Sequence, residues 1–453
     1  MTEAARVILG RILSFAEEPR LAGAGALRLI ENGAVLVEGG VIAAIGEAGD
    51  IVAQAPAGAA LDDFGDKLIL PGFIDAHIHY PQTRVIASYG TQLLEWLQKY
   101  TFVEEQKLRD PRHAEFVARF FLDELFRQGT TTAAVYCTVH PASVDALFAE
   151  AEARGARMIA GKVMMDRNAP ETLRDTPQRG YDESKALIQR WRGRGRLGYA
   201  ITPRFAPTST DAQLEAAGAL AREHPEAYVQ THLCENHAEI ALVKELFPWT
   251  KTYTEVYQRY GLLGPRTVLG HCIHLEESEV AMLAESGSVA AFCPTSNLFL
   301  GSGLFDMRRL QEHAPPVRVA LATDVGGGTS YSLLETANEA YKVLQMNGQS
   351  WPAAQALYQL TLGNARALGL EDRIGAVSAG FEADLVVLDS RATPAMAHRM
   401  EAVDGDLAEE LFILMTMGDD RAVAETYVAG RPVKSAIDPR PAKQGESGRH
   451  NGL

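Results

Sequence analysis

The sequence has few cysteines, no long apolar run and no excess of basic residues. Its 453 residues include four cysteines, which form no C-x-x-C pair: Cys137, Cys234, Cys272 and Cys293. This spacing is typical of reduced thiols in a cytosolic protein and not of a disulfide framework. No uninterrupted apolar stretch is long enough to span a bilayer, and the first residues show neither a secretory nor a twin-arginine signal. We therefore expect a cytoplasmic protein that does not bind membranes.

The charge balance is acidic. There are 58 Asp and Glu residues against 43 Lys and Arg residues, for a net charge of −15. An acidic chain without a basic block is a poor candidate for binding nucleic acid or anionic membranes. A small neutral substrate stays compatible with this charge. The length and the hydrophobic share of 47% allow one large domain with a smaller one beside it.

Strand-like alternation marks both ends of the chain. The first sixty residues read as short strands separated by glycine turns, with no helix, and the same character returns in GAVSAGFEADLVVLD and VAETYVAGRPV. We expect residues 1–68 and 377–440 to form one composite β-sandwich domain, with a catalytic domain at 69–376. The polar, Gly- and Pro-rich residues 441–453 are predicted to be a disordered tail.

Eight short apolar runs alternate with helical segments between those ends. In chain order, the eight stretches are LILPGFIDAHIH, TTAAVYC, ARMIAGKVMMD, LGYAITPRF, AYVQTHLCEN, TVLGHCIHL, GSVAAFCPTSN and RVALATDVGGG. Eight β-then-α units predict an α/β fold of the (β/α)8 TIM-barrel type. The competing interpretation is a doubly wound open sheet, which would favour a G-x-G-x-x-G turn after an early strand, and none is present.

Polar side chains close most of these runs. In a barrel they would meet at one rim, where TIM-barrel enzymes carry out their chemistry. A single histidine or aspartate at a strand end is more often a satisfied structural group. The shared register of the whole set favours a site instead. The set is His77, His79, Arg204, Phe205, His232, Glu235, His271 and Asp324.

Four of these residues have the chemistry of metal ligands. Imidazole and carboxylate groups at His77, His79, His232 and Asp324 suit Zn²⁺, and Fe²⁺ in some sites. A water in an open coordination position would have its pKa lowered to about 7. No lysine ends the fourth run, where a bridging carbamate would need one, so we expect one metal per chain. Lys162, inside the third run, is interpreted as structural.

Two further residues are predicted to move or stabilise charge. Glu235 stands one helical turn beyond His232, where a carboxyl group can carry protons, although a first-turn glutamate is also favoured by the helix dipole alone. His271 closes the run TVLG and is expected to orient the attacking water. A second histidine, His274, lies close by. It could take the role of His271, but a surface histidine is the favoured interpretation.

The order H-x-H, His, His, Asp over eight strands resembles the metal-dependent amidohydrolases. Within them, five motifs are similar to the guanine deaminase family: HIHYPQ at 77–82, PRFAPTS at 203–209, THLCEN at 231–236, PTSNLFLGSG at 294–303 and TDVGGGTSYS at 323–332. The other zinc route to base deamination uses H-x-E with P-C-x-x-C, which is absent here. The resemblance covers residues 7 to 435.

The resemblance implies a zinc-dependent hydrolase that converts guanine and water into xanthine and ammonia, and a homodimer. It assigns proton transfer to Glu235, His271 and Asp324, and substrate contacts to Gln82, Arg204, Phe205, His232 and Glu235. The alternatives are a relative acting on 8-oxoguanine, a pterin or a triazine, and a non-catalytic scaffold. Residues 80–102 are long for a βα connection, which is consistent with a lid, with packing or with dimer contacts.

Overall fold

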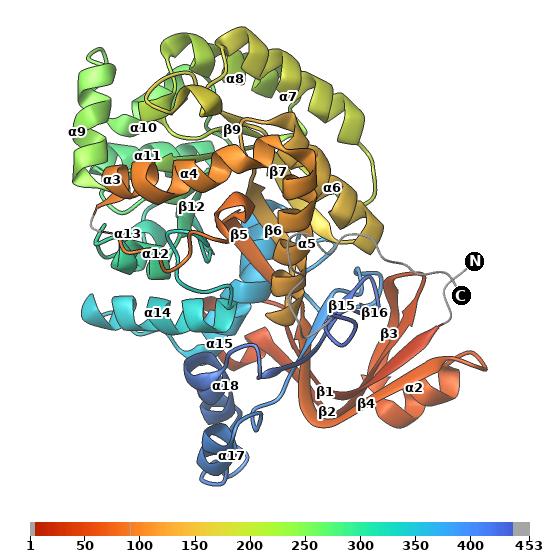
Figure 1. Cartoon of the computed structure of the whole chain (residues 1–453). Coiled ribbons are helices and arrows are strands. Elements are labelled where there is room, and N and C mark those ends of the chain that lie inside the picture. Colours follow the sequence, from red (N-terminus) through yellow and green to blue (C-terminus); the bar gives the residue numbers. More distant parts are fainter. Residues whose placement is uncertain (1–4, 91, 438–453) are drawn as a thin grey trace, which may run out of the picture.

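The protein is described from a computed structural model, which covers residues 5–90 and 92–437. Its larger part is a parallel sheet that curls into a barrel (Figure 1). The strands follow the order of the sequence: β5 (Phe73–His79), β6 (Thr130–Tyr136), β7 (Arg157–Gly161), β9 (Gly198–Pro203), β10 (Tyr228–Leu233), β11 (Thr267–His271), β12 (Val289–Phe292) and β13 (Arg318–Leu321), while β8 (Val163–Met164) pairs with β9. All eight predicted runs contain one of these strands, so the barrel prediction is confirmed.

The two ends of the sheet meet beside the site. The backbone N–H of Asp324 donates to the carbonyl oxygen of His77 at 2.9 Å. The hydroxyl group of Thr323 donates to Asp75 at 2.5 Å. These bonds bring the residues that follow β13 next to those of β5, so the first and the last strand can contribute to one site.

Amphipathic helices cover the outside of the barrel because each carries one apolar face. In α5, for example, Asp110 caps the first turn through Arg112 N–H, and Val117, Phe121 and Leu125 are buried. The helices after the strands are α5 (Pro111–Arg127), α6 (Pro141–Arg154), α7 (Pro177–Trp191), α8 (Asp211–Glu223), α9 (His237–Leu246), α10 (Tyr253–Arg259), α11 (Glu277–Ser286), α12 (Pro294–Phe299), α13 (Met307–Gln311), α14 (Leu333–Met346), α15 (Ala353–Tyr358) and α16 (Asn364–Leu368).

The connection from β5 to β6 contains helices of its own before α5. They are η2 (Tyr80–Gln82), α3 (Leu93–Trp96), the π-helix η3 (Leu97–Thr101), α4 (Phe102–Glu105) and η4 (Gln106–Arg109). Figure 1 shows α3 and α4 lying across the barrel on the side of α9 and β12. Trp96, Leu97 and Phe102 are buried here against Phe205 and Leu300. This connection therefore packs onto the rim of the barrel.

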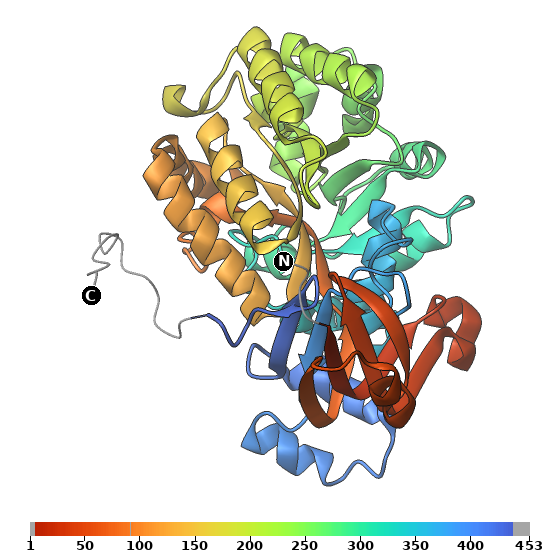
Figure 2. The same cartoon turned by 90° about the vertical axis from the view of Figure 1, so that its right-hand side faces the viewer.

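A second sheet joins segments from both ends of the chain (Figure 2). Its strands run in the order β16 (Arg431–Pro432), β15 (Val423–Val428), β14 (Leu385–Leu388), β4 (Ala60–Pro71), β1 (Arg6–Phe15), β2 (Leu27–Glu38) and β3 (Val41–Glu47). Residues 69–71 pair with β14 in this sheet, and the barrel begins at Phe73. The composite domain division stays a prediction, and its last residues, 438–440, and the tail 441–453 lie outside the described residues.

The first sixty residues do contain helices, contrary to expectation. The main one, α2 (Ala48–Gln54), follows β3 and buries Ile51 against the sheet. The short α1 (Pro19–Ala22) lies between β1 and β2, and α17 (Pro394–Met400) and α18 (Leu407–Met417) follow β14. A single buried side chain anchors α2, so its periodicity is too weak to show in the sequence.

Candidate metal centre and purine pocket

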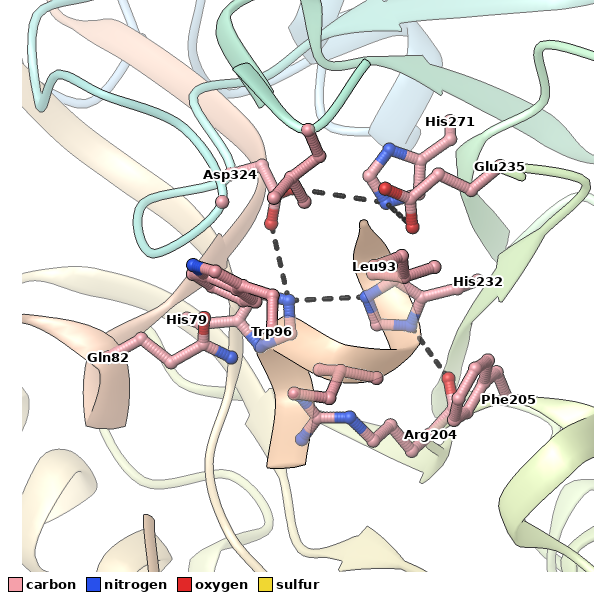
Figure 3. Close-up of a pocket in the computed structure, with 13 residues that line it drawn as sticks. His79, Gln82, Leu93, Trp96, Arg204, Phe205, His232, Glu235, His271 and Asp324 are labelled. Carbon is pink, nitrogen blue, oxygen red and sulfur yellow. Dashed lines mark hydrogen bonds and ion pairs between the residues drawn. The ribbon is translucent and has the colours of Figure 1, made fainter. Parts of the chain in front are cut away.

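Four imidazoles and two carboxyl groups converge at the rim of the barrel, and all of them except His77 are labelled in Figure 3. We call this group the histidine cluster: His77, His79, His232, Glu235, His271 and Asp324. They come from the ends of β5, β10, β11 and β13 or directly after them. Each is at most 8% exposed. The strand-end residues of the sequence prediction therefore lie together.

The backbone is shaped to bring these side chains inward. Between the pairs Asp75–Ala133 and Ile78–Val135, strand β5 has two residues where β6 has one. An extra residue of this kind bends a strand and re-aims its side chains, often beside active sites. His271 and Asp324 have φ angles of 70° and 50°, which side-chain-bearing residues rarely adopt. Gly270 leaves room for His77, because a Cβ there would lie 2.6 Å from the ring.

The ring nitrogens of the cluster fit a metal ion. His79 Nε2 lies 3.2 Å from His232 Nε2 and 3.3 Å from Asp324 Oδ1. His77 Nε2 lies 3.4 Å from the same oxygen, yet neither ring nitrogen of His77 has a hydrogen-bond partner among the described residues. Buried polar atoms are rarely left without partners. A cation between these donor atoms would give His77 Nε2, His79 Nε2, His232 Nε2 and Asp324 Oδ1 a shared partner.

Two hydrogen bonds fix the tautomers of the remaining rings. His232 Nδ1 lies 2.7 Å from the carbonyl oxygen of Arg204, which can only accept. His271 Nδ1 likewise faces Asn297 Oδ1 at 2.9 Å. Both rings can therefore donate from Nδ1. His232, whose pKa is lowered, then presents an unprotonated Nε2 to the cluster, as a metal-binding imidazole must.

Charge at the cluster is set by burial and by the neighbouring groups. Burial alone would raise the pKa of Asp324, but the imidazoles of His77, His79 and His271 outweigh it and hold that pKa well below its usual range. Burial lowers the pKa of His79 to about 3, although Asp324 opposes the change, and it lowers the pKa of His232 well below the usual value, assisted by the other imidazoles. At neutral pH the cluster thus holds an ionised Asp324 carboxylate beside the neutral rings of His79 and His232.

Glu235 differs from Asp324 because it retains its proton. Burial, followed by the charge of Asp324, raises its pKa to about 8. Its Oε2 lies 3.2 Å from His271 Nε2, and the Ser302 hydroxyl group donates to its Oε1 at 3.1 Å. At pH 7 it can therefore donate a proton. Two carboxyl groups held at different pKa values are the arrangement that acid–base chemistry requires.

The segment around Glu235 is held by a second buried carboxyl group. Glu239 accepts the backbone N–H of Glu235 at 3.0 Å and the Tyr253 hydroxyl group at 2.8 Å. Burial, and then the charge of Glu235, raises its pKa to about 7. Glu239 also forms a capping box with Asn236 at the start of α9. The loop between β10 and α9 is thus fixed by its own helix.

A pocket opens beside the histidine cluster and encloses about 370 Å³, part of which faces solvent. Its other walls are Gln82, Leu93, Trp96, Leu97, Arg204, Phe205, Leu300 and Gly327. Apolar side chains with one guanidinium and one amide group suit a small, flat, polar-edged ligand.

Gln82 and Arg204 share one carboxylate that the sequence did not reveal. Gln82 Nε2 donates to Glu105 Oε1 at 2.9 Å, and Arg204 Nη1 lies 2.9 Å from both Glu105 oxygens. We call these three residues the Arg204 cluster. Gly326 permits the close approach of the loop after β13, since a Cβ there would lie 1.9 Å from Gln82 Oε1.

Comparison with known proteins adds the family. Residues 68–433, which are most of the chain, match the Amidohydrolase family. The chain belongs to the amidohydrolase family. It is 50% identical to the guanine deaminase of Escherichia coli (strain K12) over 410 residues, which are 90% of this chain and 93% of the relative.

Solved structures of the same amidohydrolase type superpose closely. The E. coli guanine deaminase gives a TM-score of 0.91 at 48% identity and covers 94% of this chain and 99% of its own. The guanine deaminase from Bradyrhizobium japonicum gives 0.91 at 37% identity, covering 95% and 99%. That from C. acetobutylicum, with guanine bound in its active site, gives 0.83 at 27% identity, covering 94% and 99%.

The structure also places the residues whose roles were left open. His274 is half-buried and does not line the pocket: its Nε2 faces the Ser302 carbonyl oxygen at 2.7 Å, and its ring is tilted against that of exposed His237. Lys162 is buried and pairs with Asp175, away from the pocket lining.

Sequence reasoning missed Asn297, Ser302, Trp96 and Glu105. Asn297 ends the motif PTSN after the seventh strand, so the strand-end rule alone points to it. Glu105 follows Glu104 in an ordinary charged segment, and no signal in the sequence marks it.

Proposed function

We propose that this protein is a guanine deaminase, which hydrolyses guanine at carbon 2 to xanthine and ammonia. The observation that carries the proposal is the pairing of two clusters across one small pocket. The histidine cluster holds a neutral acid and an ionised carboxylate, and the Arg204 cluster offers polar edges to a ligand. The similarity to the E. coli guanine deaminase over 90% of the chain supports the same substrate.

The metal is proposed to be one zinc ion per chain, with Fe²⁺ as the alternative. His77, His79, His232 and Asp324 would hold it, because three imidazoles and one carboxylate suit Zn²⁺. When bound, such an ion supplies a water molecule that loses its proton near neutral pH.

Protons are proposed to move through three side chains. Asp324, whose low pKa keeps it ionised, accepts a proton from the attacking water. Glu235, protonated at pH 7, donates to ring nitrogen 3 as the water oxygen bonds to carbon 2. His271, fixed by Asn297, stabilises the charge that develops beside Glu235 and helps Asp324 to protonate the departing amine. One water is consumed and one ammonia leaves, and the proton of the carbon-2 hydroxyl group returns to Glu235 as the carbonyl group of xanthine forms.

Substrate orientation is assigned to the opposite walls. The Arg204 guanidinium can bond the purine oxygen and a neighbouring ring nitrogen, and the Gln82 amide faces the same edge. Phe205 provides an aromatic surface next to His232, 6.2 Å between ring centroids. His232 and Glu235 would contact the reacting end of the base.

The proposal extends to assembly and location: a homodimer in the cytoplasm. A homodimer follows from the family resemblance, and light scattering of the purified protein measures it. A cytoplasmic location agrees with four free, buried cysteines. Among the described helices, none combines the length and apolar character needed to cross a bilayer.

The test is a turnover assay on the zinc-loaded protein. Guanine, adenine, cytosine, 8-oxoguanine, a pterin and a triazine are incubated separately, and xanthine, other products and ammonia are quantified. We expect rapid conversion of guanine and at least about 100-fold slower reaction of the others. Inert guanine together with turnover of another heterocycle would assign the pocket to that substrate instead.

A further inference from the structure

The two residues assigned to the purine edge are held by one buried carboxylate, Glu105. Gln82 lies on η2, Arg204 follows β9, and Glu105 ends α4, so three separate segments meet here. Their exposed fractions are 2%, 3% and 0%. Oε1 of Glu105 accepts from both partners, and Oε2 accepts a second time from Arg204. Neither residue can turn without breaking a bond to the same group.

This arrangement decides which polar atoms remain for a ligand. The amide NH₂ group of Gln82 gives one of its two hydrogens to Glu105, which orients the amide and leaves the oxygen Oε1 to accept. Arg204 meets Glu105 through Nη1 alone, so Nη2 and Nε are left to donate. The ring of Phe102, also on α4, lies 5.6 Å from the centre of the guanidinium. The pocket therefore presents one acceptor beside a fixed pair of donors (Figure 3).

We infer that Glu105 is a specificity-determining positioning residue, which sets this acceptor–donor pattern so that it matches guanine. The inference rests on the proposed function. Guanine offers N1–H as a donor, with O6 and N7 as acceptors on the same side, and an arginine fork commonly bonds that O6–N7 pair. Adenine has a bare N1 and an amino group at carbon 6, so its pattern is reversed at both positions. Glu105 also compensates the charge of Arg204, which favours a neutral base over an anion.

The competing explanation is that Glu105 only neutralises a buried arginine. A second arginine–glutamate pair in the chain provides a control that separates these two explanations. Arg11 Nη1 lies 3.0 and 2.8 Å from the two oxygens of Glu410, and Ser390 donates to the same carboxylate at 2.9 Å. Glu410 is 6% exposed and lies on α18, outside the pocket lining. Glu410→Gln thus disturbs a similar carboxylate–guanidinium pair without touching the site, although Arg11 keeps a second partner in Glu31 at 2.7 Å.

The experiment measures the binding of two purines that lack the 2-amino group. Hypoxanthine keeps N1–H, O6 and N7 as in guanine, and adenine reverses the first two. Their dissociation constants are measured by calorimetry with zinc-loaded wild type, Glu105→Gln, Glu105→Asp and Glu410→Gln. KM and kcat for guanine are measured on the same preparations.

We expect Glu105→Gln to narrow the preference for hypoxanthine over adenine by at least about tenfold, because its own NH₂ group opposes the donors of Gln82 and Arg204. KM for guanine should rise about 10- to 100-fold, with kcat changed much less. Glu105→Asp keeps the charge and should restore part of the preference. Glu410→Gln should lower Tm and leave both constants unchanged.

The outcomes separate the inference from the proposed function. An unchanged hypoxanthine–adenine preference in both Glu105 variants would overturn the role of Glu105, even if guanine is turned over normally. A fall in kcat with KM and preference unchanged would overturn it as well. If wild type converts no guanine, the proposed function fails, while the binding preference still reports on Glu105.

Discussion

The two walls of the pocket are built in different ways. The histidine cluster is supplied by strand ends of the barrel or by residues directly after them, and hydrogen bonds to backbone carbonyl groups and neighbouring side chains fix its rings. The Arg204 cluster instead combines one residue after β9 with two from the long connection between β5 and β6. The strand ends thus carry the groups for the reaction, and the connection carries those that choose the ligand. Substitutions in the histidine cluster, which is the first wall, should lower kcat. Substitutions in the Arg204 cluster, which is the second wall, should raise KM.

The largest effect is expected for Glu235→Gln. The amide cannot donate the proton that Glu235 holds at neutral pH, so kcat for guanine should fall about 10³-fold. KM should change little, and the metal content measured by atomic emission should stay at wild-type level. Steady-state kinetics with guanine checks this expectation.

The matched control for that variant is Glu279→Gln. Glu279 is also buried and binds backbone N–H groups, those of Thr254 and Glu276, but it lies outside the pocket lining. It should keep kcat within about threefold of wild type. Equal losses in the two variants would contradict a proton-donating role for Glu235.

Arg204→Lys tests the second wall. A lysine keeps the positive charge but lacks the planar fork, so KM for guanine should rise about 100-fold while kcat falls much less. Arg11→Lys makes the same change in the pair with Glu410 and should leave KM unaltered. A loss confined to kcat would show that Arg204 acts on the reaction and not on binding.

Asn297→Ala should have a smaller effect on the first wall. The residue fixes His271 through Nδ1 without lining the pocket. Loss of such an orienting bond typically costs about tenfold, here in kcat. Asn297→Ser, which keeps a hydrogen-bonding oxygen, should recover part of the rate. An unchanged kcat in both variants would show that Asn297 does not support the reaction by orienting His271.

Changing the pH within the neutral range should alter kcat/KM less than any of these substitutions. The raised pKa of Glu235, about 8, means that the acid form is present below that pH and is lost above it. Asp324 raises this pKa, whereas Ser302 and Arg204 lower it, and His271 is its other neighbour. We therefore expect kcat/KM to halve near pH 8 and then to fall about tenfold per unit.

Glu235→Gln removes the titrating group and is the control for this profile. Its residual kcat/KM should lack the alkaline fall between pH 7 and 9. Wild-type activity that rises through pH 8 would mean that Glu235 acts in its ionised form.

The sequence was informative where chemistry follows strand periodicity. His77, His79, His232, His271 and Asp324 each close or follow an apolar run, and parallel strands in a barrel must end at one rim, so their convergence was predictable. Gln82, Arg204 and Phe205 received their roles from family motifs alone.

A hydrogen-bond partner that comes from a distant, irregular segment could not be predicted from the sequence. Glu105 meets Arg204 across 99 positions, through a π-helix and short turns that carry no periodic pattern. The positive φ angles at His271 and Asp324 could not be predicted from the sequence either, because only a small share of histidines and aspartates adopt them.

The most direct test of the two-wall arrangement is a crystal structure of zinc-loaded Glu235→Gln with guanine, since this variant should bind the base and convert it about 10³-fold more slowly. We predict that O6 and N7 face Arg204, that N1–H faces Gln82 Oε1, and that the 2-amino group lies beside Asp324 and His79. Guanine bound with its 2-amino group toward Arg204 would contradict the assignment of the two walls.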